Sequence, residues 1–261
     1  MLSLTRLGPD PASDPRPPLL IVHGLFGSAR NWGAVSRRIA ESRPVAAVDM
    51  RNHGDSFHAP RNDYEAMADD LAEVIAELGG TADVLGHSMG GKAAMVLALT
   101  RPELVSRLIV ADIAPVAYDH SQLRYIHAMK GLDLTGLSSR SEADARLAET
   151  LDEPGVRAFL LQSLDLRADP TAWKLNLDVL EAEMDTITGW PGTEGRFDGP
   201  SLFLSGEKSN YVTAEGRIKI EAQFPKARFE TVEGAGHWVH AEKPREVQAA
   251  VETFLSESDP A

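Results

Sequence analysis

Val84–Gly91, with the sequence VLGHSMGG, is the stretch that decides the fold of this chain. An apolar run leads into a serine between two glycines, and helix-forming residues follow, so the stretch predicts a strand, a sharp turn and a helix. Gly86 and Gly90 leave room for the strand and the helix to approach each other closely. This pattern is typical of a nucleophile elbow, which predicts that Ser88 is an exposed nucleophile on a strained turn.

The composition narrows the classes of protein to which this chain can belong. Its 261 residues, 43% of them apolar, suit one large or two small globular domains. A formal net charge of −13 repels phosphate groups, which argues against nucleic acid or an anionic membrane surface as partner. The absence of cysteine excludes disulfides and thiolate catalysis. Because the first residues lack a signal-peptide pattern and no apolar run reaches the ~18 residues of a membrane helix, we expect a cytoplasmic protein.

Apolar runs and amphipathic segments alternate along most of the chain. The spacing is that of parallel strands joined by crossover helices, which predicts an α/β fold with a mostly parallel sheet and helices on both faces. Besides the strand before Ser88, the predicted strands are residues 19–22, 45–48, 107–112, 201–204 and 228–232. The predicted helices are residues 31–39, 64–78, 88–100, 213–223 and 244–255.

Residues 116–196 interrupt this alternation. No strand run of comparable strength occurs there, and the segment contains four helical patterns, at residues 122–130, 141–151, 154–164 and 177–187. We therefore predict a helical cap at 116–196, inserted into an α/β core made of residues 1–115 and 197–261.

A serine hydroxyl becomes a useful nucleophile only beside a base, which a carboxylate in turn orients. His237 is the candidate base, because it lies in the run 234–238 (GAGHW), directly after a predicted strand. His240, three residues later, is the weaker alternative. The base therefore follows the nucleophile in the chain order expected for an elbow serine.

Two backbone amides are expected to stabilise a developing oxyanion. Met89 supplies one, because it follows the nucleophile at the start of a helix. The loop His23–Gly27 (HGLFG), after the first buried strand, supplies the other. We predict the amide of Leu25 as this donor, with Phe26 as the alternative, whose ring would otherwise line the acyl pocket.

Four sequence motifs carry a resemblance to a known family: residues 23–28 (HGLFGS), 49–54 (DMRNHG), 86–92 (GHSMGGK) and 236–244 (GHWVHAEKP). Together they resemble the serine esterases of the α/β-hydrolase superfamily, in the branch of bacterial esterases and their mitochondrial abhydrolase relatives. The resemblance covers essentially the whole chain. It implies the α/β-hydrolase fold and hydrolysis of carboxylic esters or thioesters through an acyl-enzyme, with no metal and no organic cofactor.

The carboxylate that orients the base does not follow the commonest superfamily pattern. In that pattern an aspartate occurs in a Gly-x-x-Asp motif after the strand that follows the cap. This chain has Ser209 in place of that aspartate. Glu207 is the alternative acid, but it lies beside Gly206, too close to the strand end to reach the imidazole. Asp112 ends the strand after the elbow helix, so its carboxylate emerges at the same sheet edge as Ser88. In the resembling branch the acid occupies this earlier position, so we predict Asp112 as the acid, with Ser209 hydrogen-bonding near it.

The substrate pocket is predicted beside the elbow and under the cap. Its predicted lining is Phe26, His87, Tyr118, Tyr125, Trp190 and Trp238, with Met129, Phe159, Trp173 and Met184 as further candidates from the cap. Lys92 lies one helical turn beyond Ser88. We expect it to pair with Asp49 or Asp112, or else to meet an anionic group of the substrate.

The expected substrate is a small-molecule ester or thioester with a short to medium acyl chain, acyl-CoA included. Two alternatives remain at this stage, since fold does not decide substrate. One is other chemistry with the same three residues, such as that of perhydrolases or C–C hydrolases. The other is a non-catalytic binding module. Oligomeric state cannot be predicted from the sequence.

Overall fold

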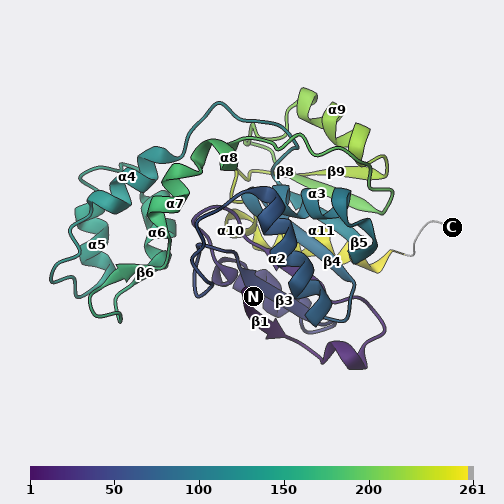
Figure 1. Cartoon of the computed structure of the whole chain (residues 1–261), viewed down its shortest axis with the longest axis horizontal. Helices are drawn as coiled ribbons and strands as arrows, with labels where there is room; N and C mark the ends of the chain where they lie inside the picture. The colour runs from purple at the N-terminus through teal and green to yellow at the C-terminus, as the bar shows by residue number, and fades with distance from the viewer. Residues whose placement is uncertain (258–261) are drawn as a thin grey trace.

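The chain folds around a seven-stranded sheet with the strand order β1-β3-β2-β4-β5-β8-β9 (Figure 1). The computed structural model describes residues 1–257, so the last four residues of the predicted core lie outside the described part. The edge strand β1 is antiparallel to β3, and every other neighbouring pair in this sheet is parallel. The strands are β1 (Ser3–Leu7), β2 (Leu19–Val22), β3 (Val45–Asp49), β4 (Ala82–His87), β5 (Val105–Ala111), β8 (Ser201–Gly206) and β9 (Ala227–Val232).

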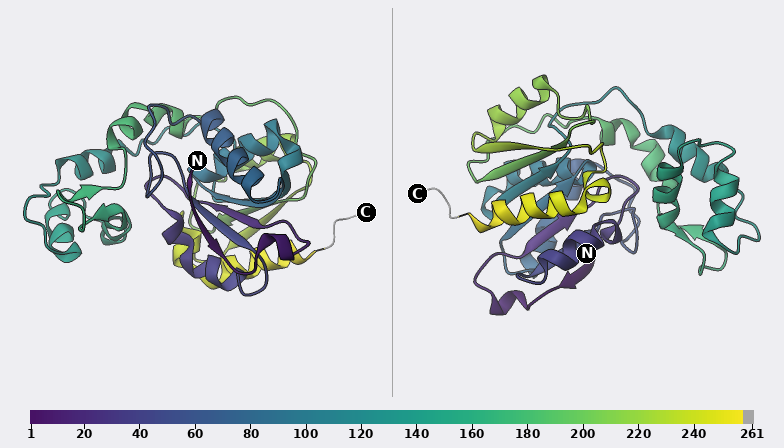
Figure 2. Two further views of the ribbon diagram at one scale, coloured as in Figure 1. Left: turned by 60° about the horizontal axis from the view of Figure 1, so that its bottom comes forward. Right: turned by 180° about the vertical axis from the view of Figure 1, so that it is seen from behind.

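Helices cover both faces of the sheet, as Figure 2 shows. One face packs against α2 (Tyr64–Glu77), α3 (Met89–Thr100) and α9 (Ala214–Gln223), and the other against α1 (Gly33–Ile39) and α11 (Pro244–Ser256). Successive side chains of β2 alternate between these two apolar layers and all are buried, which explains the unbroken apolar run of its sequence. The predicted parallel sheet between two helical layers is confirmed.

Residues between β5 and β8 leave the sheet and form a separate group of helices, seen to one side in Figure 1. We call residues 116–196 the insertion. The predicted helix at 177–187 is two helices that meet at Glu183, and a pair of two-residue strands occurs that the sequence did not predict. The elements are α4 (Leu123–Gly131), α5 (Arg140–Leu147), α6 (Pro154–Leu160), β6 (Leu164–Asp165), β7 (Ala172–Trp173), α7 (Leu177–Ala182) and α8 (Met184–Thr188).

Short helical turns complete the chain and include α10 (Val239–Glu242), between β9 and α11. The 3-10 turns are η1 (Pro11–Ser13), η2 (Ala29–Trp32), η3 (Pro102–Leu104) and η4 (Leu161–Ser163). The entry and exit of the insertion lie side by side, because the amide of Tyr118 donates to the carbonyl oxygen of Thr188 at 3.0 Å. Within residues 1–257, no helix is long and apolar enough to cross a membrane.

Candidate active site

Ser88 lies on a strained turn between β4 and α3. Its backbone angles, φ 52° and ψ −119°, are costly for a residue with a side chain. A Cβ atom on Gly86 would lie 2.3 Å from the carbonyl oxygen of Gly90, and one on Gly90 would lie 2.4 Å from that of His23. Both glycines are therefore required by close backbone approach, as the sequence pattern indicated.

Ser88, His237 and Asp112 form a chain of hydrogen bonds. The His237 Nε2 atom lies 3.0 Å from Ser88 Oγ, and His237 Nδ1 lies 2.7 Å from Asp112 Oδ2. Asp112 is fully buried at the end of β5, where its Oδ1 atom accepts from the Gly206 amide at 3.0 Å. Ser209 Oγ donates to the other carboxylate oxygen at 2.5 Å. The carboxylate is thus held on both sides, with one oxygen directed at the imidazole.

The two weaker alternatives lie outside this chain of hydrogen bonds. The Glu207 carboxylate accepts from the amide of Gly234 at 2.7 Å, and in the described part of the chain no hydrogen bond joins it to His237. His240 is buried and stacks on Trp32, with ring centroids 4.3 Å apart and planes 10° apart. Neither residue therefore replaces its counterpart beside Ser88.

Two backbone amides near Ser88 are free to receive a negative charge. Met89 is the first residue of α3, so its N–H group has no acceptor within the helix. The amide of Phe26 donates to His53 Nε2 at 3.2 Å, whereas the Leu25 amide has no hydrogen-bond partner among residues 1–257. This difference favours Leu25 over Phe26 as the second donor.

A cavity of about 190 Å³ opens beside Ser88. Most of the predicted pocket residues line it, namely Phe26, His87, Tyr118, Tyr125, Phe159 and Trp238. The walls also include residues that the sequence analysis did not identify, among them Tyr64, His120, Val156, Leu160, Ile187 and Tyr211. Aromatic and aliphatic side chains from the insertion therefore face the candidate nucleophile.

Four predicted pocket residues do not line this cavity. Trp190 follows α8, where the chain returns towards β8, and its half-buried ring packs against the apolar core instead. Met129 and Met184 are fully buried in that core, and the Trp173 indole donates to the Met129 carbonyl oxygen at 3.0 Å. These side chains help to hold the insertion together.

Tyr211 stacks face to face on His237, with ring centroids 3.8 Å apart and planes 15° apart. Its own backbone carbonyl accepts from the Tyr118 hydroxyl at 2.7 Å. The only sequence signal for this contact is position, because Tyr211 lies two residues after Ser209 in the loop that follows β8.

His87 supports the loop that carries His237. Its Nε2 atom donates to the backbone carbonyl of His237 at 2.9 Å, and burial holds the pKa of His87 well below its ordinary value, so the ring is neutral. Within residues 1–257, no three His, Cys, Asp or Glu side chains form a group that could hold a metal ion.

The predicted ion pair of Lys92 is wrong, whereas its contact with an anionic group of the substrate stays a prediction. The side chain is buried and lines the cavity, but it pairs with neither Asp49 nor Asp112. Its ammonium donates to the carbonyl oxygen of Thr188 at 2.9 Å and to that of Gly189. The physical reason is the end of α8, where the last carbonyl groups lack helical partners and attract a cation.

The buried ammonium of Lys92 predicts a pH-dependent stability. Burial lowers its pKa to about 7, well below the ~10.4 of an unfolded lysine. Between these two pKa values Lys92 is protonated in the unfolded chain and neutral in the folded one, so its contribution to the free energy of unfolding rises with pH. Below the lower value Lys92 is charged in both states, and the folded protein then bears the full cost of burying the charge. We expect the stability of wild type relative to Lys92→Met to increase from about pH 7 to about pH 10.

Urea unfolding at both pH values measures this difference. The exposed Lys219→Met provides the matched control and should show no such increase. A difference for Lys92→Met that stays constant or falls as pH rises would contradict the expectation.

Comparison with known proteins gives the family. The sequence matches the Alpha/beta hydrolase family over residues 19–250. The chain belongs to this family. This alpha/beta hydrolase is 41% identical over 249 residues to the sn-1-specific diacylglycerol lipase ABHD11 of Mus musculus, a match that covers 92% of this chain and 81% of the relative. It is 38% identical to esterase YbfF of Escherichia coli, over 92% of this chain and 93% of the relative.

A solved structure agrees with these relatives. The structure of a marine microorganism esterase is similar to this hydrolase with a TM-score of 0.90 and 36% sequence identity, over 97% of this chain and 98% of that one. The predicted resemblance to esterases of this superfamily is therefore confirmed.

Proposed function

We propose that this protein is a serine hydrolase that cleaves carboxylic esters and thioesters through an acyl-enzyme on Ser88. The observation that carries the proposal is the chain of hydrogen bonds from Ser88 through His237 to Asp112, at an elbow facing an aromatic cavity. The names of the esterase and lipase relatives support ester hydrolysis.

In the first half-reaction, Ser88 Oγ attacks the substrate carbonyl carbon while His237 Nε2 takes the hydroxyl proton. The carbonyl oxygen becomes an oxyanion, which the amides of Leu25 and Met89 stabilise. As the C–O or C–S bond breaks, His237 returns the proton to the leaving alkoxide or thiolate. Asp112 fixes the imidazole with its Nδ1 atom protonated, so that Nε2 is the accepting nitrogen.

The second half-reaction uses water in place of the serine hydroxyl. His237 takes a proton from the water, the hydroxide adds to the acyl carbon, and the bond from that carbon to Ser88 Oγ breaks. The proton then returns to Ser88, and the carboxylic acid leaves. Each cycle consumes one ester or thioester and one water.

The substrate is a small molecule with a short to medium acyl chain, thioesters of coenzyme A included. The insertion acts as a cap, because Tyr125 and Phe159 bring apolar surface from it to the cavity wall. We also propose the predicted division of the chain into an α/β core and a cap domain. We propose the cytoplasm as the location of this activity.

A panel of p-nitrophenyl esters with acyl chains of graded length, beside acyl-CoA thioesters, tests the substrate class. We expect kcat/KM to be highest for the short and medium chains and to fall for long ones, because the cavity is small. Replacing a large side chain of the cap that lines the cavity by a small one, as in Phe159→Ala, should shift the preference towards longer acyl chains. The proposed class is wrong if no ester or thioester is cleaved faster than by the Ser88→Ala variant.

A further inference from the structure

The loop between β2 and η2 has an unusual backbone at Phe26. Its φ of 63° lies in the left-handed region, which is costly for an aromatic residue. Both of its peptide groups are nevertheless occupied: the amide donates to His53 Nε2 at 3.2 Å, and the carbonyl oxygen accepts from Ser163 Oγ at 2.9 Å. A strained residue persists only where its surroundings hold it, and these two side chains do so from opposite ends.

The peptide groups of this loop are linked to the candidate oxyanion donor. The Leu25 N–H group shares a planar peptide with the Gly24 carbonyl, so the direction of one sets that of the other. The Gly24 oxygen accepts from the Gly27 amide at 3.0 Å and from His23 Nδ1 at 2.8 Å. Because the Gly27 amide shares its peptide with the Phe26 carbonyl, a change at Phe26 is transmitted to the Leu25 amide.

Ser163 belongs to the insertion, in the turn η4. It is more than 130 residues from Phe26 in sequence, yet its side chain is buried against the loop. The Ser163 carbonyl accepts from the Lys174 amide at 2.8 Å, and the Lys174 ammonium lies 2.5 Å from Asp55 in the loop after β3. The hydroxyl that holds Phe26 is therefore fixed by the insertion's own structure and by a second contact with the core.

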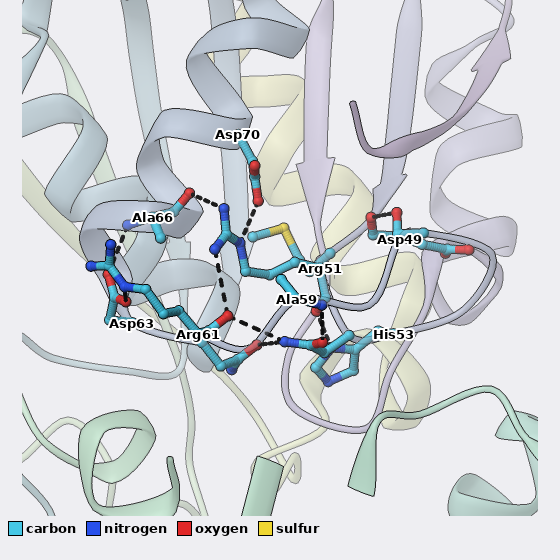
Figure 3. Close-up of polar contacts among 12 residues, drawn as sticks. Asp49, Arg51, His53, Ala59, Arg61, Asp63, Ala66 and Asp70 are labelled. Carbon is cyan, nitrogen blue, oxygen red and sulfur yellow. Dashed lines mark hydrogen bonds and ion pairs between the residues drawn. The ribbon is translucent and has the colours of Figure 1, made fainter. Parts of the chain in front are cut away.

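His53 belongs to that loop after β3, and it is set to accept a hydrogen bond. Its Nδ1 atom lies 2.9 Å from the Arg51 carbonyl and must donate to it, which leaves Nε2 as the acceptor for Phe26. Burial, with a smaller effect of neighbouring His23, lowers the pKa of His53 to about 3, so the ring stays neutral. Arg51 reaches from this loop to Asp70 on α2 (Figure 3), where its Nε atom donates to Asp70 Oδ2 at 2.6 Å and fixes the loop on that helix.

The insertion also contacts the backbone beside His53. Leu175 forms an antiparallel bridge with His53, and the Asn176 amide donates to the Asn52 carbonyl at 3.0 Å. Both side chains that hold Phe26 are thus attached to the same part of the insertion, residues 163–176.

We propose that His53 and Ser163 are positioning residues which together hold the Leu25 amide in its oxyanion-binding direction, so that the insertion completes the oxyanion hole as well as shaping the pocket. This inference rests on the proposed function. It makes catalysis depend on how the insertion is seated, since its displacement would release the Phe26 carbonyl and relax the strained loop.

The test compares variants at the two positions with matched controls. Ser163→Ala removes one hydroxyl and should lower kcat/KM about fivefold, the size of one hydrogen bond. His53→Leu removes the acceptor and should lower kcat/KM about 10²-fold, as loss of an oxyanion donor does. His53→Gln, whose side-chain oxygen can accept from Phe26, should recover most of that loss. The exposed Ser141→Ala, on the insertion, and His58→Leu, in the loop after β3, are the controls and should match wild type.

Rates are expressed per serine titrated by a fluorophosphonate, so that misfolded protein is not counted. The inhibition constant of a trifluoromethyl ketone, whose adduct carries an oxyanion, should rise in proportion to the fall in kcat/KM, while KM changes little. The double variant should lose less than the product of the single losses, because both side chains hold the same residue.

The inference is overturned if Ser163→Ala, which removes a single atom, keeps the wild-type rate and inhibitor affinity per titrated serine. It is also overturned if the control variants lose as much as their partners. Failure of the proposed function gives a different result, in which the probe does not label Ser88 in the wild-type protein.

Discussion

Ser88→Ala is expected to lower kcat by about 10⁶-fold, as removal of a catalytic serine does in serine proteases. The rate enhancement that remains comes from substrate binding and oxyanion stabilisation alone. The fold should survive, because Ala, like Ser, is a non-glycine residue and bears a similar strain at this position. Within residues 1–257 the Ser88 hydroxyl makes one hydrogen bond, to His237. The loss should therefore appear in turnover and not in thermal unfolding.

A phosphonate or sulfonyl-fluoride probe identifies the nucleophile directly. Mass spectrometry of peptides should find the adduct on Ser88 in wild type and in the exposed control Ser141→Ala, and no adduct in Ser88→Ala. An adduct on Ser28 or Ser209, or normal turnover by Ser88→Ala, would show that the elbow serine is not the nucleophile.

The elbow could be predicted because part of its geometry is local. Gly86 is required by the backbone of Gly90, four residues later, so its spacing in the sequence reflects the geometry of the turn. Gly90 is required by the backbone of Val22 and His23 at the end of the neighbouring strand β2, a contact that the sequence does not show. Asp112 and His237 could be placed because each directly follows a strand or its short loop, and the carboxyl ends of parallel strands lie at one edge of the sheet.

The pocket was less predictable, because residue type does not say which way a side chain points. Trp190 and Tyr118 lie at opposite ends of the insertion, and the tyrosine lines the cavity with its hydroxyl hydrogen-bonded to the backbone of Ala114 and Tyr211. Lys92 and His53 illustrate a second limit. Their partners are backbone groups of distant residues, and a backbone group leaves no trace in the sequence.

Asp112→Asn is expected to lower kcat by about 10⁴-fold, the loss found for the equivalent change in serine proteases. The reason lies in the donors around the buried carboxylate. One oxygen accepts from the Gly206 amide, and the other accepts from His237 and Ser209. An asparagine has a single oxygen, so one side must lose its acceptor.

If that oxygen stays on Gly206, the Asn NH₂ group faces His237 and forces Nδ1 to accept. The proton then resides on Nε2, which can no longer take the proton of Ser88. Glu207→Gln keeps an oxygen for the Gly234 amide and should retain kcat within about threefold, as for a surface hydrogen bond. Rates per titrated serine, with thermal unfolding of both variants, separate lost chemistry from lost folding. A large loss of kcat in Glu207→Gln with little change in Asp112→Asn would show that the acid is Glu207, after the strand that follows the insertion.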